Sequence, residues 1–316
     1  MKKQKTVSIK AKLLGVIIPV VIAIVVVLVV AAYQISAGTI KKYSQNLLQS
    51  SVENQASQIE AWLNENLASF QMAKTIIEDL KPSDEELKTI LDGYYGYNSN
   101  YPEGLYVADS TGQLITASES TKKESDVTNS TWYKEGLTRV NMAVGSAYQN
   151  ADGVNVISAS GILNDGSDKV RVISADMTLD RIAIIVNSFI EMNDAEAFLV
   201  DKTSGVILAN RDSSLISQTL GAEGQSHFYQ LTAEKAAEKD YNFATLDGNM
   251  TVFQEVDGTN WLLISYIPTS IVLSDLTQLR NIMIVISVIC IALLCVLIER
   301  CLLYTSDAAD EARSVD

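Results

Sequence analysis

The sequence predicts an α+β protein in which a long helix and two antiparallel-sheet modules stand between two transmembrane helices. Three observations support this fold class. Uncharged apolar runs occupy residues 13–32 and 282–298, near the two ends of the chain. Helical hydrophobic spacing extends over residues 36–80, and a strand–turn–strand pattern at residues 105–116 returns at residues 198–209.

The composition excludes several function classes. The 316 residues carry a net charge of −14, whereas a nucleic-acid-binding protein needs a basic face for the phosphates. All three cysteines, Cys290, Cys295 and Cys301, stand near the C-terminal end, so no disulfide framework supports the middle of the chain. The single histidine, His227, stands in a polar loop (residues 224–228) and rules out a multi-His metal site. We expect no metal and no cofactor.

Five lysines and no acidic residue precede the first apolar run. Leu13–Ala32 has 20 residues, enough to cross a hydrocarbon core of about 30 Å at about 1.5 Å per residue. Segments rich in lysine beside a transmembrane helix stay on the cytoplasmic side of the membrane. Residues 1–12 are therefore predicted to be cytoplasmic, and residues 13–35 to form the first transmembrane helix. A cleaved signal peptide is the alternative, but its apolar core usually has only about 7–15 residues.

Residues 36–80 are predicted to form one long outer helix. Hydrophobic residues recur there at spacings of three, four and seven: Val52, Ile59, Leu63, Leu67, Phe70, Ile77 and Leu80. Pro82 disfavours helical geometry in the residue before it and ends the helix. Residues 83–86 then form a capping box for a short helix through Leu91. The seven-residue spacing also allows a second copy to pack on the Val52/Ile59 face, which we expect to be a dimer seam.

The first module is predicted from short β-prone runs separated by turns. Leu105–Asp109 and Leu114–Thr116 flank a turn at Gly112. Three more strands are predicted at residues 143–148, 154–160 and 170–176, with turns at residues 150–153 and 164–166. A helix over residues 180–189 completes the module.

The pattern then returns. Phe198–Thr203 echoes Tyr106–Thr111, with Gly205 one position later than Gly112. Residues 247–248 open a hairpin, and residues 260–266 close it. An internal repeat of this kind indicates two copies of one module, a distal one at about residues 90–185 and a proximal one at about residues 190–270.

Residues 281–300 are predicted to form the second transmembrane helix, in which Cys290 and Cys295 act as small hydrophobes. From Cys301 to Glu311 the sequence resembles the in-frame translation of a transposase-end adapter used to prepare sequencing libraries. We therefore expect residues 301–316 to be an artefact and the natural protein to continue past about Arg300. An intact stop codon after residue 316 in independent DNA would contradict this.

A candidate ligand site is predicted in the first module. It combines aromatic faces with one carboxylate, as a pocket for a small cationic or amphipathic ligand requires: Tyr106, Trp132, Tyr133, Tyr148 and Asp176. The alternative is that the aromatic residues are core packing and that Asp176 ends a strand.

The order of these parts resembles the ligand-sensing half of a methyl-accepting chemotaxis receptor with a double Cache (dCache) ectodomain. The resemblance covers residues 1–300 and is carried by Ser8–Leu14, Leu105–Asp109, Trp132-Tyr133, Val172–Asp176 and Trp261–Leu263. It implies two PAS-like modules in an extracellular sensor at residues 36–280, with the ligand in the distal module.

Members of that family that bind amino acids use an Arg two residues before the Trp for the ligand carboxylate, and an Asp at a strand end for the ligand ammonium. The matching positions here are Trp132, Tyr133, Tyr148 and Asp176, with Tyr106 as a wall. The Arg position holds Ser130, and Asn150 stands where a further Asp is often found. Because the bidentate clamp for a carboxylate is missing, we expect a small amine or another polar metabolite, not a free amino acid.

The resemblance implies a chemoreceptor of the cell membrane that is multi-pass, homodimeric and not an enzyme. Its partners would be a cytoplasmic histidine kinase and a coupling protein, reached through a C-terminal half that this chain lacks. The same type of ectodomain is also the N-terminal sensor of histidine kinases and diguanylate cyclases. A surface hydrolase is a further alternative; no nucleophile–His pair is available, although 38 acidic residues leave a two-carboxylate site open.

Overall fold

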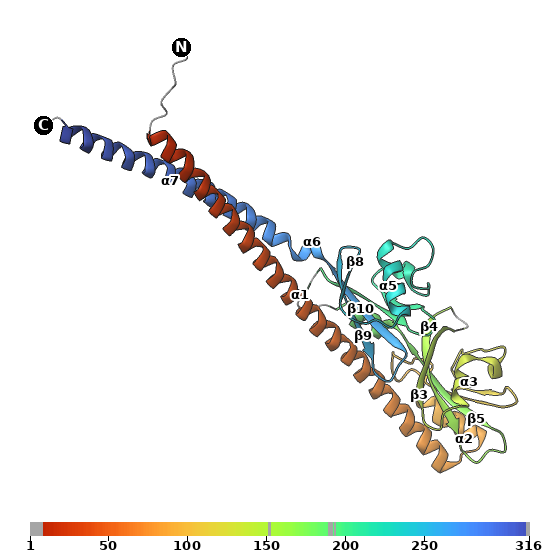
Figure 1. Ribbon diagram of the computed structural model, residues 1–316. Helices are drawn as coiled ribbons and strands as arrows, with labels where there is room; N and C mark the ends of the chain where they lie inside the picture. The colour runs from red at the N-terminus through yellow and green to blue at the C-terminus, as the bar shows by residue number, and fades with distance from the viewer. Residues whose placement is uncertain (1–8, 151–152, 189–191, 193, 314–316) are drawn as a thin grey trace. The chain divides into compact units, whose positions relative to one another are not determined.

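The computed structural model describes residues 9–150, 153–188, 192 and 194–313 (Figure 1). The predicted cytoplasmic lysines before residue 9, the turn residues 151–152 and the end of the helix predicted over residues 180–189 lie outside this part. The described chain divides into two compact units, of which one spans Gln45–Pro268 and the other joins the two terminal segments.

The terminal unit is helical. Helix α1 (Ile9–Leu80) starts in it and continues without interruption past Pro19 into the other unit. Helices α6 (Thr269–Val272) and α7 (Ser274–Arg313) form the other terminal segment. Within the described residues, Gly15–Leu80 and Thr269–Ile298 are long and apolar enough to cross a membrane, and their most apolar windows are unburied. The helical backbone of residues 301–313 has no bearing on the adapter origin, which stays a prediction.

The unit Gln45–Pro268 holds two five-stranded antiparallel sheets. The first module has the strand order β2-β1-β5-β4-β3. Its strands are β1 (Leu105–Asp109), β2 (Leu114–Ile115), β3 (Ala143–Gln149), β4 (Asn155–Leu163) and β5 (Arg171–Thr178). Its helices are α2 (Asp84–Asp92), the 3-10 turn η1 (Val127–Asn129), α3 (Thr131–Gly136) and α4 (Asp180–Val186). The predicted capping box at the start of α2 is present, with Ser83 and Glu86 exchanging hydrogen bonds.

The second module repeats this topology, with the strand order β7-β6-β10-β9-β8. Its strands are β6 (Glu196–Asp201), β7 (Ile207–Asn210), β8 (Ala244–Leu246), β9 (Asn249–Val256) and β10 (Trp261–Pro268). The 3-10 turn η2 (Ser213–Leu215) and helix α5 (His227–Ala237) cover it. The predicted α+β fold class, with a long helix and two antiparallel-sheet modules, is confirmed.

The residues around His227 differ from the prediction. They were expected to form a polar loop, but His227 is the first residue of helix α5. The two buried residues of α5 are Phe228, in the aromatic core of the second module, and Thr232 one turn later; Tyr229, Ala233 and Ala236 also pack against this core. Because a threonine and two small alanines take inward positions, the hydrophobic spacing that identifies a helix is weak in this part of the sequence.

The Val52/Ile59 face of α1 is fully buried within the chain itself. Between these residues on the same face, Gln55 is also buried and hydrogen-bonds to the end of α4. A face with no exposed surface cannot receive a second copy, so the prediction that it forms a dimer seam is wrong. The seven-residue spacing instead reflects packing of one helix against its own sensor modules.

Candidate ligand-binding site

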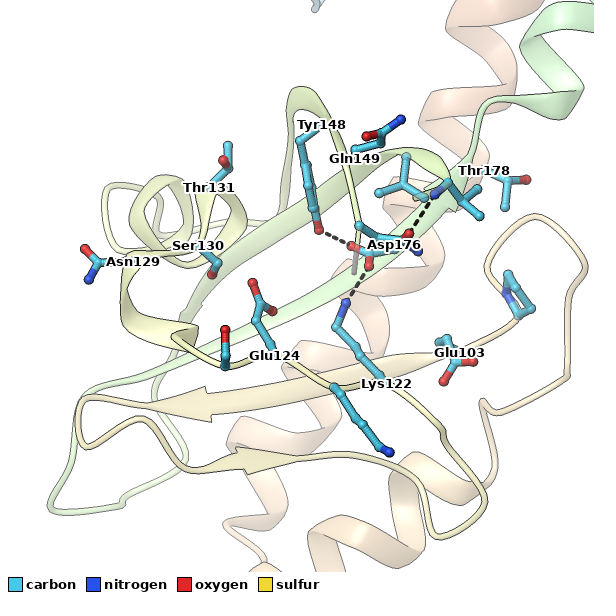
Figure 2. A pocket seen from close by; sticks show the side chains of 16 residues that line it. Glu103, Lys122, Glu124, Asn129, Ser130, Thr131, Tyr148, Gln149, Asp176 and Thr178 are labelled. Carbon is cyan, nitrogen blue, oxygen red and sulfur yellow. Dashed lines mark hydrogen bonds and ion pairs between the residues drawn. The ribbon is translucent and has the colours of Figure 1, made fainter. Parts of the chain in front are cut away.

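A pocket of about 540 Å³ opens on the first module. Part of its wall is formed by the loop residues 122–125 and by residues 129–131, where η1 ends and α3 begins. Strands β3, β4 and β5, the turn between β3 and β4, and residues 102–103 before β1 form the rest (Figure 2). This volume falls within the range of about 300–1,000 Å³ that is usual for small-molecule sites. Most of the lining side chains are polar, and five of them carry a charge: Glu103, Lys122, Lys123, Glu124 and Asp176.

Asp176, near the end of β5, is the most heavily bonded side chain of the pocket wall. Its Oδ1 accepts hydrogen bonds from the hydroxyls of Tyr106 at 2.6 Å, Tyr148 at 2.8 Å and Ser158 at 2.6 Å. Its Oδ2 accepts a hydrogen bond from Nζ of Lys122 at 2.6 Å. Each carboxylate oxygen offers about two acceptor positions, so three donors crowd Oδ1, whereas Lys122 takes one of the two positions on Oδ2.

Strand register brings these hydroxyls together. Ser158 lies directly opposite Asp176 in the β4–β5 pair, and Tyr106 lies opposite Ser174 in the β1–β5 pair. Side chains two residues apart on a strand share a face, so Tyr106 reaches Asp176 diagonally. Burial, with the nearby charge of Asp176, raises the pKa of Tyr106 and of Tyr148. Both phenols therefore stay protonated and donate to the carboxylate.

Lys122 was not predicted to belong to the site. Its Nζ lies 4.2 Å from the ring centroid of Tyr106 as well as 2.6 Å from Asp176. Only 9% of the Lys122 side chain and 7% of the Asp176 side chain are exposed, so the two form a buried ion pair. In Figure 2 the Lys122 side chain extends from its loop toward Asp176, with Tyr148 approaching the same carboxylate from the opposite side.

Three of the predicted site residues lie behind the pocket wall. Tyr106, Trp132 and Tyr133 are buried and belong to one core cluster of the first module. The ring centroids of Tyr106 and Trp132 are 4.9 Å apart, edge to face, and Trp132 donates its indole N–H to Glu124 at 2.8 Å. Of the five predicted residues, only Tyr148 and Asp176 line the pocket.

The two positions that depart from the amino-acid-binding pattern both line the pocket. Ser130 stands where the pattern has Arg, and its hydroxyl donates to the carbonyl of Val127 at 2.6 Å. A short hydroxyl that is already bonded to the backbone cannot replace the two-pronged clamp of a guanidinium. Asn150 directly follows the last residue of β3.

In the second module, the position that corresponds to Asp176 holds an aromatic ring. Phe198, the counterpart of Tyr106, lies opposite Ile264, so Tyr266 stands where the first module has Asp176. The Tyr266 ring packs 4.4 Å from the Phe228 ring, and its hydroxyl donates to Glu196 at 2.5 Å. The carboxylate that defines the pocket of the first module is therefore replaced by core packing in the second.

A family model described as Cache domain matches residues 32–276. Among solved structures, the chain resembles the ligand-binding domain of the Pseudomonas fluorescens chemoreceptor CtaA in complex with L-isoleucine. The sequence identity is 20% and the TM-score 0.60, and the match covers 76% of this chain and 98% of that chain. Among curated protein sequences, none is similar enough to count as a match.

Two further solved structures are similar. The ligand-binding domain of Mlp24 with asparagine has 17% identity and a TM-score of 0.60, covering 75% of this chain and 97% of that chain. The ligand-binding domain of the Pseudomonas aeruginosa PAO1 amino-acid chemoreceptor PctC, in complex with GABA, has 19% identity and a TM-score of 0.55. That match covers 71% of this chain and 99% of that chain. At such identities the likeness shows a shared fold.

Proposed function

The chain belongs to the Cache domain family, and from this premise we propose that it is the sensing half of a transmembrane chemoreceptor. The first module binds a small extracellular ligand in the pocket beside Asp176, and the two apolar helices cross the cell membrane. The observation that carries this proposal is the pocket, because it unites a small-molecule volume with polar groups aimed at one place.

The proposed ligand is a small amine or another polar metabolite that needs no carboxylate clamp. Ser130 supports this choice, because it leaves the pocket without a guanidinium at that position. Tyr148 and Asp176 provide an aromatic ring and a carboxylate for a cationic group. A cation–π contact contributes only about 0.5–2 kcal/mol, so affinity has to come from several contacts acting together.

In the proposed mechanism, the ligand binds one arrangement of the sensor more tightly than another and so shifts their populations. Helix α1 is suited to transmission, because it is continuous from Ile9 to Leu80 and enters the core of the sensor. The proposal includes a cytoplasmic N-terminus, a homodimer, and a cytoplasmic histidine kinase and coupling protein as partners. A histidine kinase or diguanylate cyclase output would use the same sensor, and the natural sequence after about Arg300 distinguishes these outputs.

The test is a ligand screen on the full chain in lipid nanodiscs, followed through tryptophan fluorescence during thermal unfolding. All three tryptophans, Trp62, Trp132 and Trp261, lie in the sensor unit. A ligand that binds only the native state raises the melting temperature, and the screen covers amines, amino acids, purines and organic acids. Binding should be lost in Asp176→Ala and weakened in Tyr148→Phe.

Tyr97→Phe is the matched control, because Tyr97 is 76% exposed and lies outside the pocket lining. It should bind like the wild type. A ligand whose binding survives both Asp176→Ala and Tyr148→Phe would refute the pocket as its site.

A further inference from the structure

We call the corner of the pocket between Asp176 and the Tyr106 ring the ammonium subsite. It already contains an ammonium group, that of Lys122, which belongs to the chain itself. Nζ of Lys122 has a carboxylate oxygen at 2.6 Å and the Tyr106 ring centroid at 4.2 Å. A carboxylate and an aromatic face at these distances are the two groups that recognise a protonated amine. The chain's own side chain thus shows which ligand group this corner of the pocket is built to take.

The Lys122 ammonium and an amine ligand cannot use the subsite together. Oδ1 of Asp176 is taken by the hydroxyls of Tyr106, Tyr148 and Ser158, and Oδ2 by Lys122. An arriving ammonium meets only the second position on Oδ2, where the positive charge of Lys122 repels it, and the Tyr106 face is already covered by Nζ of Lys122. The three hydroxyls come from strands of the sheet, whereas Lys122 comes from the loop between β2 and η1. Lys122 is therefore the donor that can leave.

We propose that Lys122 is a specificity-determining residue, which fills the ammonium subsite with a tethered cation that any cationic ligand group has to displace. This inference rests on the pocket proposed above as the ligand site. Ligands that bind elsewhere in the pocket without a cationic group meet no such competition. An amine therefore binds the native sensor only by displacing Lys122, and with a lower apparent affinity than the unoccupied subsite would give.

The gain in amine affinity that is expected on removing Lys122 depends on how often Lys122 occupies the subsite. The apparent affinity of a ligand falls in proportion to the fraction of molecules whose site is free. A tethered group also competes at an effective concentration in the millimolar range or higher. If the subsite is free in about one molecule in ten or fewer, removing the Lys122 side chain strengthens amine binding about tenfold or more.

The experiment compares the full-length wild type with Lys122→Ala and Lys88→Ala in nanodiscs. The probe is n-propylammonium, which has the same three carbons and ammonium group that Lys122→Ala removes, and 1-propanol is the neutral control. Thermal unfolding is followed through tryptophan fluorescence over a range of probe concentrations. Lys88 is an exposed lysine on α2 outside the pocket lining, so its variant reports general salt and amine effects.

Lys122→Ala should be stabilised by n-propylammonium at concentrations about tenfold below those needed for the wild type and for Lys88→Ala. The gain should be absent with 1-propanol and lost when Asp176→Asn is added. An equal response of Lys122→Ala and Lys88→Ala overturns the proposal. If Lys122→Ala does not fold, Lys122→Met keeps the apolar stem, and ammonium chloride should stabilise it more than sodium chloride does. Equal stabilisation by the two salts also overturns the proposal.

The result is separable from the sensor function. A metabolite that binds through Asp176 while Lys122→Ala gains no amine response removes the role of Lys122 and leaves the sensor in place. An amine gain in Lys122→Ala without any metabolite hit supports the role of Lys122 and counts against the ligand classes screened.

Discussion

The side-chain amide of Gln55, on the long helix α1, donates a 2.7 Å hydrogen bond to the backbone carbonyl of Ser188, just beyond α4. The same nitrogen lies 3.2 Å from the carbonyl of Ile185 and 3.3 Å from that of Val186. The last carbonyls of a helix have no partner within the helix, so Gln55 supplies one for the end of α4. It thereby ties α1 to the last helix of the first module.

We predict that Gln55→Leu lowers the melting temperature of the sensor. The substitution keeps an apolar stem but removes the donor that the carbonyls of Ile185, Val186 and Ser188 share, of which the first two contacts are buried, at a cost of about 1–3 kcal/mol. Gln58→Leu on the same helix is the control, because Gln58 is exposed and bonds only to Asn54 among the described contacts. Equal melting temperatures for the two variants would show that the Gln55 contacts contribute nothing.

The fold was predictable because its main signals are local. The apolar runs, the proline that follows α1 and the strand–turn echo all occur within short windows of sequence. Helix α5 was missed because Thr232 takes a core position that a hydrophobic residue usually fills. The face of Val52 and Ile59 was misassigned because a periodic stripe shows that one side is covered and says nothing of what covers it.

The site was predictable only in part. Alternation along β5 and its neighbours brings Tyr148 and Asp176 to one wall, as their strands implied. Trp132 and Tyr133 are core residues because α3 packs on the sheet and turns both rings inward. Lys122 could not be found from the sequence, since it stands in a polar loop 54 residues before Asp176, and only the path of that loop joins the two charges.

Arg171 provides a test of buried charge in the first module. It pairs with Asp165 at 2.8 Å and Asp84 at 2.5 Å, and the Asp165 side chain is only 1% exposed. Arg171→Met leaves a buried carboxylate without its cation, so we expect a loss of about 3–5 kcal/mol in unfolding free energy, measured by urea denaturation. Arg211→Met should change it by less than about 1 kcal/mol, because the Arg211–Glu196 pair is exposed. Similar losses in both variants would contradict this assignment.

Asp109 makes the sensor sensitive to acid. Burial alone would raise the pKa of Asp109, but hydrogen bonds from Lys169, Thr111 and the backbone of Gln113 outweigh it and lower the pKa from 3.8 to about 2. A lowered folded-state pKa stabilises the protein above the unfolded value of 3.8, and this contribution disappears as the pH falls through about 2. Its size is on the order of 2 kcal/mol.

The measurement is urea denaturation of the wild type and of Asp109→Asn at several pH values between 6 and 2. The wild type should lose more stability than Asp109→Asn between pH 4 and pH 2, so the two curves converge on acidification. Asp212→Asn, at an exposed carboxylate, should follow the wild type more closely. Parallel curves for the wild type and Asp109→Asn would remove Asp109 as a source of acid sensitivity.

Gly136 fixes how α3 sits on the sheet, and with it the wall of the pocket. A Cβ at this position would lie 2.3 Å from Cγ1 of Val172 on β5 and 3.2 Å from Cβ of Ser160 on β4. Alanine normally favours a helix over glycine by about 1 kcal/mol, so propensity alone predicts that Gly136→Ala is stabilising. The contact with Val172 reverses this sign, because overpacking a close interface costs about 1–3 kcal/mol.

Gly136→Ala should therefore lower the melting temperature, while Lys134→Ala, on the exposed side of the same helix, should leave it nearly unchanged. Because α3 carries Trp132 and its start lines the pocket, the shift should also change the tryptophan emission of the native state. Gly136→Ala combined with Val172→Ala should recover part of the loss, since the smaller side chain makes room for the new methyl group. A Gly136→Ala variant that is as stable as the wild type would mean that α3 moves freely on the sheet, and that the pocket wall is not held in place by this contact.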